Sequence, residues 1–128
     1  MSTELTKVLP FGINEKIQNL SFATGVVNHD VSSSSIFYHT AMASSFKPDL
    51  INLPTHNNRS HVVVLILEQS SPAYFINGLS INGTDQTIKW FGDVTPTATA
   101  NEIDIVSFTI LRISNAWKVF GQSVYFGQ

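Results

Sequence analysis

The chain has 128 residues, no cysteine and a formal net charge of −2. The absence of cysteine excludes disulfides, thiolate zinc sites and cysteine nucleophiles. No cluster of Lys or Arg is present to attract nucleic acid. Residues 1–4 are polar, unlike a signal peptide, and the longest apolar run, 62–67, is too short to span a bilayer. We therefore expect one domain, made in the cytoplasm, that binds neither nucleic acid nor membrane.

Charged residues make up 12% of the chain, about half of the usual quarter. Ser, Thr and Asn replace them. Because surface charge normally keeps folded proteins soluble and separate, a neutral polar surface is best tolerated when partners cover part of it. The composition thus favours an assembling protein over a free monomer with little charge.

Residues 1–21 differ from the rest of the chain and predict an N-terminal arm. Ile17 and Leu20 fall at helical spacing, but the segment is short and follows a Pro-Phe-Gly turn signal at 10–12. We expect the arm to be disordered or laid on a neighbouring molecule. Its apolar side chains are our first interface candidates: Leu9, Phe11, Ile13 and Ile17.

Residues 22–128 carry the pattern of a β-domain. Short runs of β-branched and aromatic residues alternate with clusters of Ser, Asn, Pro and Gly, and no window predicts a long helix. This pattern predicts an all-β, antiparallel, jelly-roll-like sandwich of about eight strands. The expected strands are 22–28, 35–41, 46–53, 61–68, 73–81, 86–91, 103–113 and 116–126.

Two turns and the alternation of side chains add detail. Asn82-Gly83 suits a type I′ hairpin that would pair the strands of Ile81 and Ile88, and Ser114-Asn115 suits a second two-residue hairpin. Alternating apolar positions share one face and predict the core: Phe75, Leu79, Ile81, Ile88, Trp90, Val106, Phe108 and Ile110.

The strand 61–68 breaks the alternation because both of its faces are apolar. One face would meet the core, and the arm or a second subunit would cover the other. We prefer the subunit interface, with Val63, Leu65 and Leu67 as candidates. Tyr125 and Phe126, near the C-terminus, are further interface candidates.

Catalytic and metal-binding signals are weak. The four histidines lack metal-site spacing, the carboxylates are scattered singly, and no nucleotide-binding or serine-hydrolase motif occurs. We expect no enzyme, cofactor or metal, although a fold can still bring two carboxylates together in a hydrolase. Trp90 and Trp117 are either core residues, which we favour, or sugar-stacking platforms.

The segment 86–109 reads QTIKWFGDVTPTATANEIDIVSFT, and AWKVFG follows at 116–121. This pattern resembles a module of bacteriophage and marine-virus structural proteins, over about residues 22–128. The resemblance implies a β-sandwich that assembles as an oligomer, often a trimer, at the ends of tail fibres or in small virion proteins. It implies no catalytic residues.

We therefore expect a virion protein that docks onto itself and onto other capsid or tail proteins. Because the sequence begins at Met1 with no fibre shaft before it, we favour a capsid decoration (cement), neck or tail accessory protein. The alternative is a carbohydrate-binding, receptor-recognising tail-fibre module that binds a host surface glycan through Trp90 and Trp117.

Overall fold

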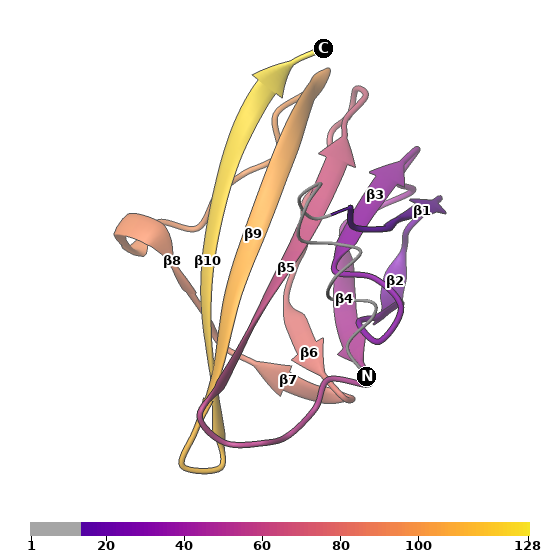
Figure 1. The fold of residues 1–128 in the computed structure, drawn as a ribbon. Coiled ribbons are helices and arrows are strands. Elements are labelled where there is room, and N and C mark those ends of the chain that lie inside the picture. Colours follow the sequence, from indigo (N-terminus) through magenta and orange to yellow (C-terminus); the bar gives the residue numbers. More distant parts are fainter. Residues whose placement is uncertain (1–13) are drawn as a thin grey trace.

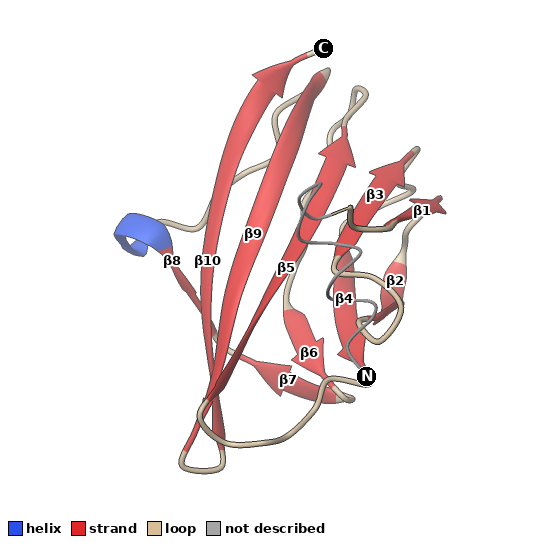
Figure 2. Ribbon diagram, in the orientation of Figure 1, coloured by secondary structure: helices blue, strands red, loops and turns tan. Residues whose placement is uncertain are grey.

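The computed structural model describes residues 14–128, which form two stacked β-sheets (Figures 1 and 2). Sheet A contains, in spatial order, β1 (Ile17–Ser21), β3 (Ile36–Thr40), β5 (Arg59–Glu68), β9 (Glu102–Ile113), β10 (Ala116–Gly127) and β8 (Ile88–Trp90). Sheet B contains β2 (Gly25–Asp30), β4 (Phe46–Ile51), β6 (Leu79–Ile81) and β7 (Thr84–Gln86). The described helix is a single 3-10 turn, η2 (Phe91–Asp93). The predicted all-β, sandwich-like class is confirmed.

The first six strands wind around the core as a coil. Successive strands alternate between the sheets, so that β1, β3 and β5 stack in parallel in sheet A and β2, β4 and β6 stack in parallel in sheet B. β9 and β10 then add to sheet A as a long antiparallel hairpin (Figure 1). The predicted antiparallel, jelly-roll-like order is therefore wrong for the coil. A chain that changes sheet at every turn returns to each sheet in the same direction.

Strand positions follow the sequence closely, but the described part of the chain forms ten strands where about eight were expected. Within the predicted strand 73–81, Leu79–Ile81 form β6 and Ile76 makes an isolated bridge to Phe46, and 86–91 is divided between two sheets. Ile81 consequently pairs with Thr84 across the predicted Asn82-Gly83 turn, whereas Ile88 pairs with Val119 in the other sheet. The pairing of Ile81 and Ile88 strands was wrong because the chain leaves sheet B after β7.

The two predicted hairpin turns are present with the required backbone. Asn82 and Gly83 have φ of 49° and 86°, and Ser114 and Asn115 have φ of 52° and 63°. Both residues of a type I′ turn need positive φ, which Asn and Gly adopt at low cost. Among residues 14–128, nine residues other than Gly have a positive φ, and five of them are asparagines. Part of the unusual asparagine content therefore serves the turns between strands.

The core lies between the sheets and contains the predicted side chains. Phe108, Val106 and Ile110 from β9 are fully buried against Leu79 and Ile81 from β6. Phe75 is also buried, and Ile88 and Trp90 are half-buried on the same core. Alternation within each strand was sufficient to identify these residues.

The predicted boundary of the arm was too late in the chain. Residues 17–21 form β1 at the edge of sheet A, in register with β3 from Ile17↔Ile36 to Ser21↔Thr40. Leu20 packs against the core and Ile17 faces outward. Leu9, Phe11 and Ile13 lie outside the described residues.

Candidate interaction surface

β5 separates its apolar residues between two environments. Val63, Leu65 and Leu67 are at most 1% exposed and belong to the core. Val62, which is 56% exposed, points to the other side of the sheet. The three residues chosen from the sequence as interface candidates are thus the wrong set. Strand alternation places Val62, Val64 and Ile66 outward instead.

The outward side of sheet A is apolar across neighbouring strands. The register aligns Tyr38, Ile66, Ile105 and Val124 in one row, and Ile17, Ile36 and Val64 in another. Ile17 and Val124 of these rows are 49% and 43% exposed, and the other members are half-buried. We call the following set the apolar face: Ile17, Ile36, Tyr38, Val62, Val64, Ile66, Ile103, Ile105, Leu111, Ile113, Phe120, Val124 and Phe126.

Charge is confined to the margins of this face. In the described strands of sheet A, three charged residues occupy outward positions: Glu68, Lys89 and Lys118. Glu68 lies in the row of Phe126, and Tyr38 Oη donates a hydrogen bond of 2.8 Å to its carboxylate. Lys118 lies in the row of Leu111, near the opposite end of the strands.

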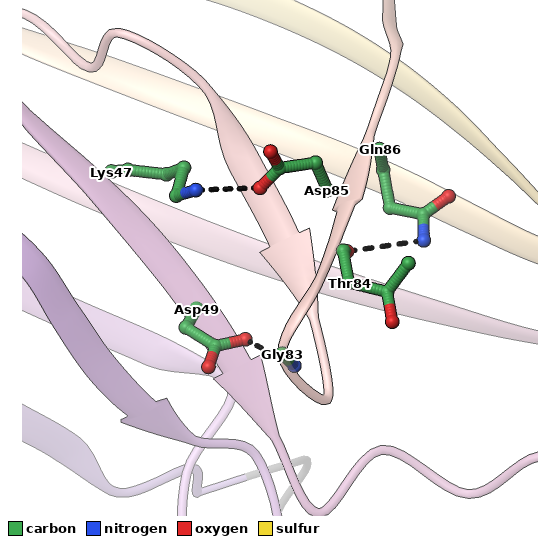
Figure 3. Close-up of polar contacts among 6 residues, drawn as sticks. All are labelled: Lys47, Asp49, Gly83, Thr84, Asp85 and Gln86. Carbon is green, nitrogen blue, oxygen red and sulfur yellow. Dashed lines mark hydrogen bonds and ion pairs between the residues drawn. The ribbon is translucent and has the colours of Figure 1, made fainter.

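The outward side of sheet B is different. Lys47 forms an ion pair with Asp85 across the sheet, and Asp49 accepts a hydrogen bond of 3.0 Å from the Gly83 amide (Figure 3). Asn28 and Asp30 also lie on this side of β2. The outer side of sheet B thus presents mainly charged and polar groups, with Val26 beside them, whereas the outer side of sheet A presents mainly apolar side chains, with Ser107, Thr109 and Gln122 among them.

The two C-terminal interface candidates lie on opposite sides of β10. Phe126 is 54% exposed and lies on the apolar face. Tyr125, 66% exposed, points to the opposite side of β10, where it pairs with the inward-facing Asp104. β9 and β10 extend past the strands of sheet B (Figure 1), which leaves the Tyr125 ring uncovered.

A shallow groove overlaps the apolar face at the edge formed by β8. It is lined by Lys89, Trp90, Phe91, Ser107, Thr109, Phe120, Gly121 and Gln122 and has a volume of about 260 Å³. Phe91 follows β8 in η2, the turn that projects from the sheets (Figure 1), and is 77% exposed. Gly92 and Asp93 have φ of 66° and 59°, which turns the chain away from the sheet directly after Phe91.

The two tryptophans, for which we favoured the core over the alternative of sugar platforms, both pack against the core. The Trp90 ring lies 6.0 Å from the rings of Phe75 and Phe108, on the core side of β8. Trp117 is half-buried, and the Arg112 guanidinium lies 4.6 Å from the centre of its ring. Trp90 contributes one side of the groove, but the exposed aromatic surface there belongs to Phe91 and Phe120. The sequence contains a signal for an exposed Phe91. This large apolar residue comes directly before Gly92 and breaks the alternation of apolar and polar residues that begins at Ile88.

Two buried histidines connect the sheets inside the core. His29 from β2 and His39 from β3 are both 0% exposed, and their Nε2 atoms are 2.8 Å apart. His29 Nδ1 lies 2.8 Å from the Val27 carbonyl oxygen and must donate to it. His29 Nε2 is therefore the acceptor, and His39 Nε2 donates the hydrogen bond between the rings. His39 Nδ1 is left with a buried lone pair and no hydrogen-bond partner in the described structure.

Burial keeps this pair neutral. It lowers the pKa of His29 and of His39 to about 4, from an ordinary value of 6.5. Two opposing contributions, the Val27 carbonyl and Asp49, raise the His29 pKa but are smaller. For His39, the neighbouring His29 adds to the lowering. Phe37 and Phe46 pack around the two rings. We interpret the pair as a neutral polar link between the two sheets.

A second buried polar group fastens the loops before β9. The Asp104 carboxylate is 1% exposed and accepts hydrogen bonds from Thr99 N, Thr99 Oγ1 and Gln69 Nε2 at 2.9, 2.9 and 3.0 Å. Gln69 in turn bonds the backbone of Tyr74. The hydrogen bonds of this carboxylate all go to Thr99 and Gln69 in the loops that precede β9. Asp104 therefore fixes these loops and has a structural role.

Within residues 14–128, no three His, Asp or Glu side chains come together as metal ligands would. In the same part of the chain, no helix is long and apolar enough to cross a membrane. Comparison with known proteins provides no relative: no family model, curated protein or solved structure matches this chain.

Proposed function

We propose that this chain is a structural protein that acts by assembly, and that the apolar face of sheet A is its contact surface. The supporting observation is the contrast between the two outer faces, one lined by ion-paired and hydrogen-bonded groups and the other by aliphatic and aromatic side chains. Exposed apolar patches of this kind mark interaction sites in soluble proteins. Low overall charge supports the same function.

The resemblance of 86–121 to virion modules supports placing this assembly in a virus particle. In that setting the chain is a capsid decoration, neck or tail accessory protein, in contact with its own copies and with other particle proteins. Binding would be driven by the burial of apolar surface, because each Å² removed from water contributes roughly 25 cal/mol. Phe120, Phe126 and Tyr38 supply the large side chains that usually dominate such contacts.

Co-sedimentation with purified virus particles tests this function. We expect the chain to travel with the particles through a density gradient, and Val62→Lys to release it into the soluble fractions. Val26→Lys is the matched control, because Val26 has a similar exposure, 60% against 56%, but lies on sheet B. The proposal fails if the wild-type chain never co-sediments, or if the two variants behave alike.

A second function is carbohydrate binding in the groove beside β8, favoured by the exposed ring of Phe91. Phe91 and Phe120 offer apolar rings for stacking on a sugar, and Ser107, Thr109 and Gln122 offer hydrogen bonds. A glycan array should then show selective binding that Phe91→Ala abolishes. Phe22→Ala, at a ring 71% exposed elsewhere on the surface, should leave it unchanged. Uniform absence of binding would remove this candidate.

A further inference from the structure

The assembly function leaves open which molecule covers the apolar face. We infer, on the basis of that proposed function, that the occupant is a second copy of this chain, packed back to back through sheet A about a two-fold axis. The strands of the two copies run in opposite directions, so that the Glu68 end of one face lies over the Lys118 end of the other.

The size of the face is sufficient for a stable dimer. β5, β9 and β10 pair over ten residues or more, and β1 and β3 over five. With a strand spacing of about 4.8 Å and a rise of about 3.3 Å per residue, these five strands present on the order of 640 Å² per copy. Two copies together hide about 1,300 Å², within the range of specific interfaces. Two sheet faces pack about 10 Å apart, as they do inside sandwiches.

The charges at the margins determine the orientation. Glu68 lies in the row of Ile103 and Phe126, whereas Lys118 lies eight residues away along the strands, in the row of Leu111. Packing with the strands in the same direction would bring like charges together at each end. Packing with the strands reversed brings each carboxylate to the end that carries the lysine. The face is therefore complementary to itself.

A self-complementary face gives a closed assembly. In an isologous dimer both copies use the same surface, so none of the apolar face remains free to bind a third copy, and other particle proteins contact the dimer outside this face. The two-fold dimer thus replaces the trimer that the resemblance to fibre modules implies. It also covers Phe120 and Thr109, so that the groove is not open to a glycan in the dimer.

Light scattering coupled to size-exclusion chromatography gives the mass of the assembly directly. We expect the wild-type chain to have twice the mass of one copy at micromolar concentration. Val62→Lys should raise the dissociation constant at least tenfold, because it places two lysines in an apolar contact. Val26→Lys, the matched change on sheet B, should leave the constant within twofold of wild type. Circular dichroism checks that both variants remain folded.

A charge exchange tests the orientation. Glu68→Lys and Lys118→Glu should each weaken the dimer several-fold, and the double variant should recover most of the wild-type affinity. Recovery is specific to opposed ends, because the hydrogen bond from Tyr38 to Glu68 is lost in Glu68→Lys and in the double variant alike. If the double variant is weaker than both single variants, the reversed packing is wrong.

The inference and the proposed function fail separately. A wild-type chain that stays monomeric at 100 μM or forms trimers overturns the dimer, as does a dimer that Val62→Lys leaves intact. If that monomer or trimer still binds particles in a manner that depends on Val62, the assembly function stands and its partner is another protein. If glycan binding appears with the monomer and Phe91→Ala abolishes it, the groove provides the function and the dimer is rejected.

Discussion

The buried pair of histidines makes the stability of the fold depend on pH in a defined window. In the unfolded chain both imidazoles have the ordinary pKa of 6.5, whereas burial lowers the pKa of each to about 4 in the folded protein. Between these values the unfolded chain binds more protons than the folded chain does. Stability is therefore complete above pH 6.5 and is lost as the pH falls toward 4.

The size of the loss follows from the same two values. At pH 5, a group with a pKa near 4 when folded and 6.5 when unfolded lowers the free energy of unfolding by about 2 kcal/mol relative to neutral pH. Two such groups cost about 4 kcal/mol, a large part of the 5–15 kcal/mol that stabilises an ordinary domain. The two rings share one hydrogen bond of 2.8 Å, whose acceptor is His29 Nε2. The lone pair of His39 Nδ1 has no partner and can take the first proton with this bond in place, whereas a proton on His29 Nε2 removes the acceptor and breaks the link between β2 and β3.

Urea unfolding, followed by tryptophan fluorescence at half-unit steps from pH 7.5 to 4.5, measures this loss. We expect His29→Leu/His39→Leu to flatten the curve over this range, because both buried imidazoles are gone. His56→Gln, which removes an exposed histidine of the loop before β5, should keep the wild-type slope. Equal stability of the wild type at pH 6.5 and 4.5, or an unchanged slope in the double variant, would refute the reasoning. Nitrogen NMR shifts should also show the Nδ1–H tautomer for His29 and the Nε2–H tautomer for His39.

Three further predictions concern packing and buried polar groups. Phe108→Ala empties the centre of the core, where Phe108 is 0% exposed, and should cost about 3–5 kcal/mol in urea unfolding; a cost below 1 kcal/mol would contradict this packing. Gly121→Ala places a Cβ 2.7 Å from the Trp90 ring and should cost about 1–3 kcal/mol with a shift in tryptophan emission; an unshifted spectrum would show that the ring lies elsewhere. Asp104→Asn turns an amide toward the donors of Thr99 and should cost about 1–3 kcal/mol, and unchanged thermal unfolding would argue against the buried network.

The sequence determined what depends on near neighbours in the chain. Alternation placed Val106, Phe108 and Ile110 on one face, because successive side chains of any strand point to opposite sides. The dipeptides Asn82-Gly83 and Ser114-Asn115 predicted tight turns, because few residues adopt positive φ at low cost. Low charge and the strand 61–68, apolar on both faces, also predicted a surface covered by a partner, which stays a prediction.

The tertiary structure decided which partners meet. The parallel coil arises because successive strands change sheet, and no local pattern records that choice. An apolar strand such as β5 has two acceptable faces, and only the position of sheet B selects Val63 for the core and Val62 for the surface. The link between His29 and His39 joins two sheets across the core. Such contacts depend on how the sheets stack, which is a property of the whole chain and not of any segment.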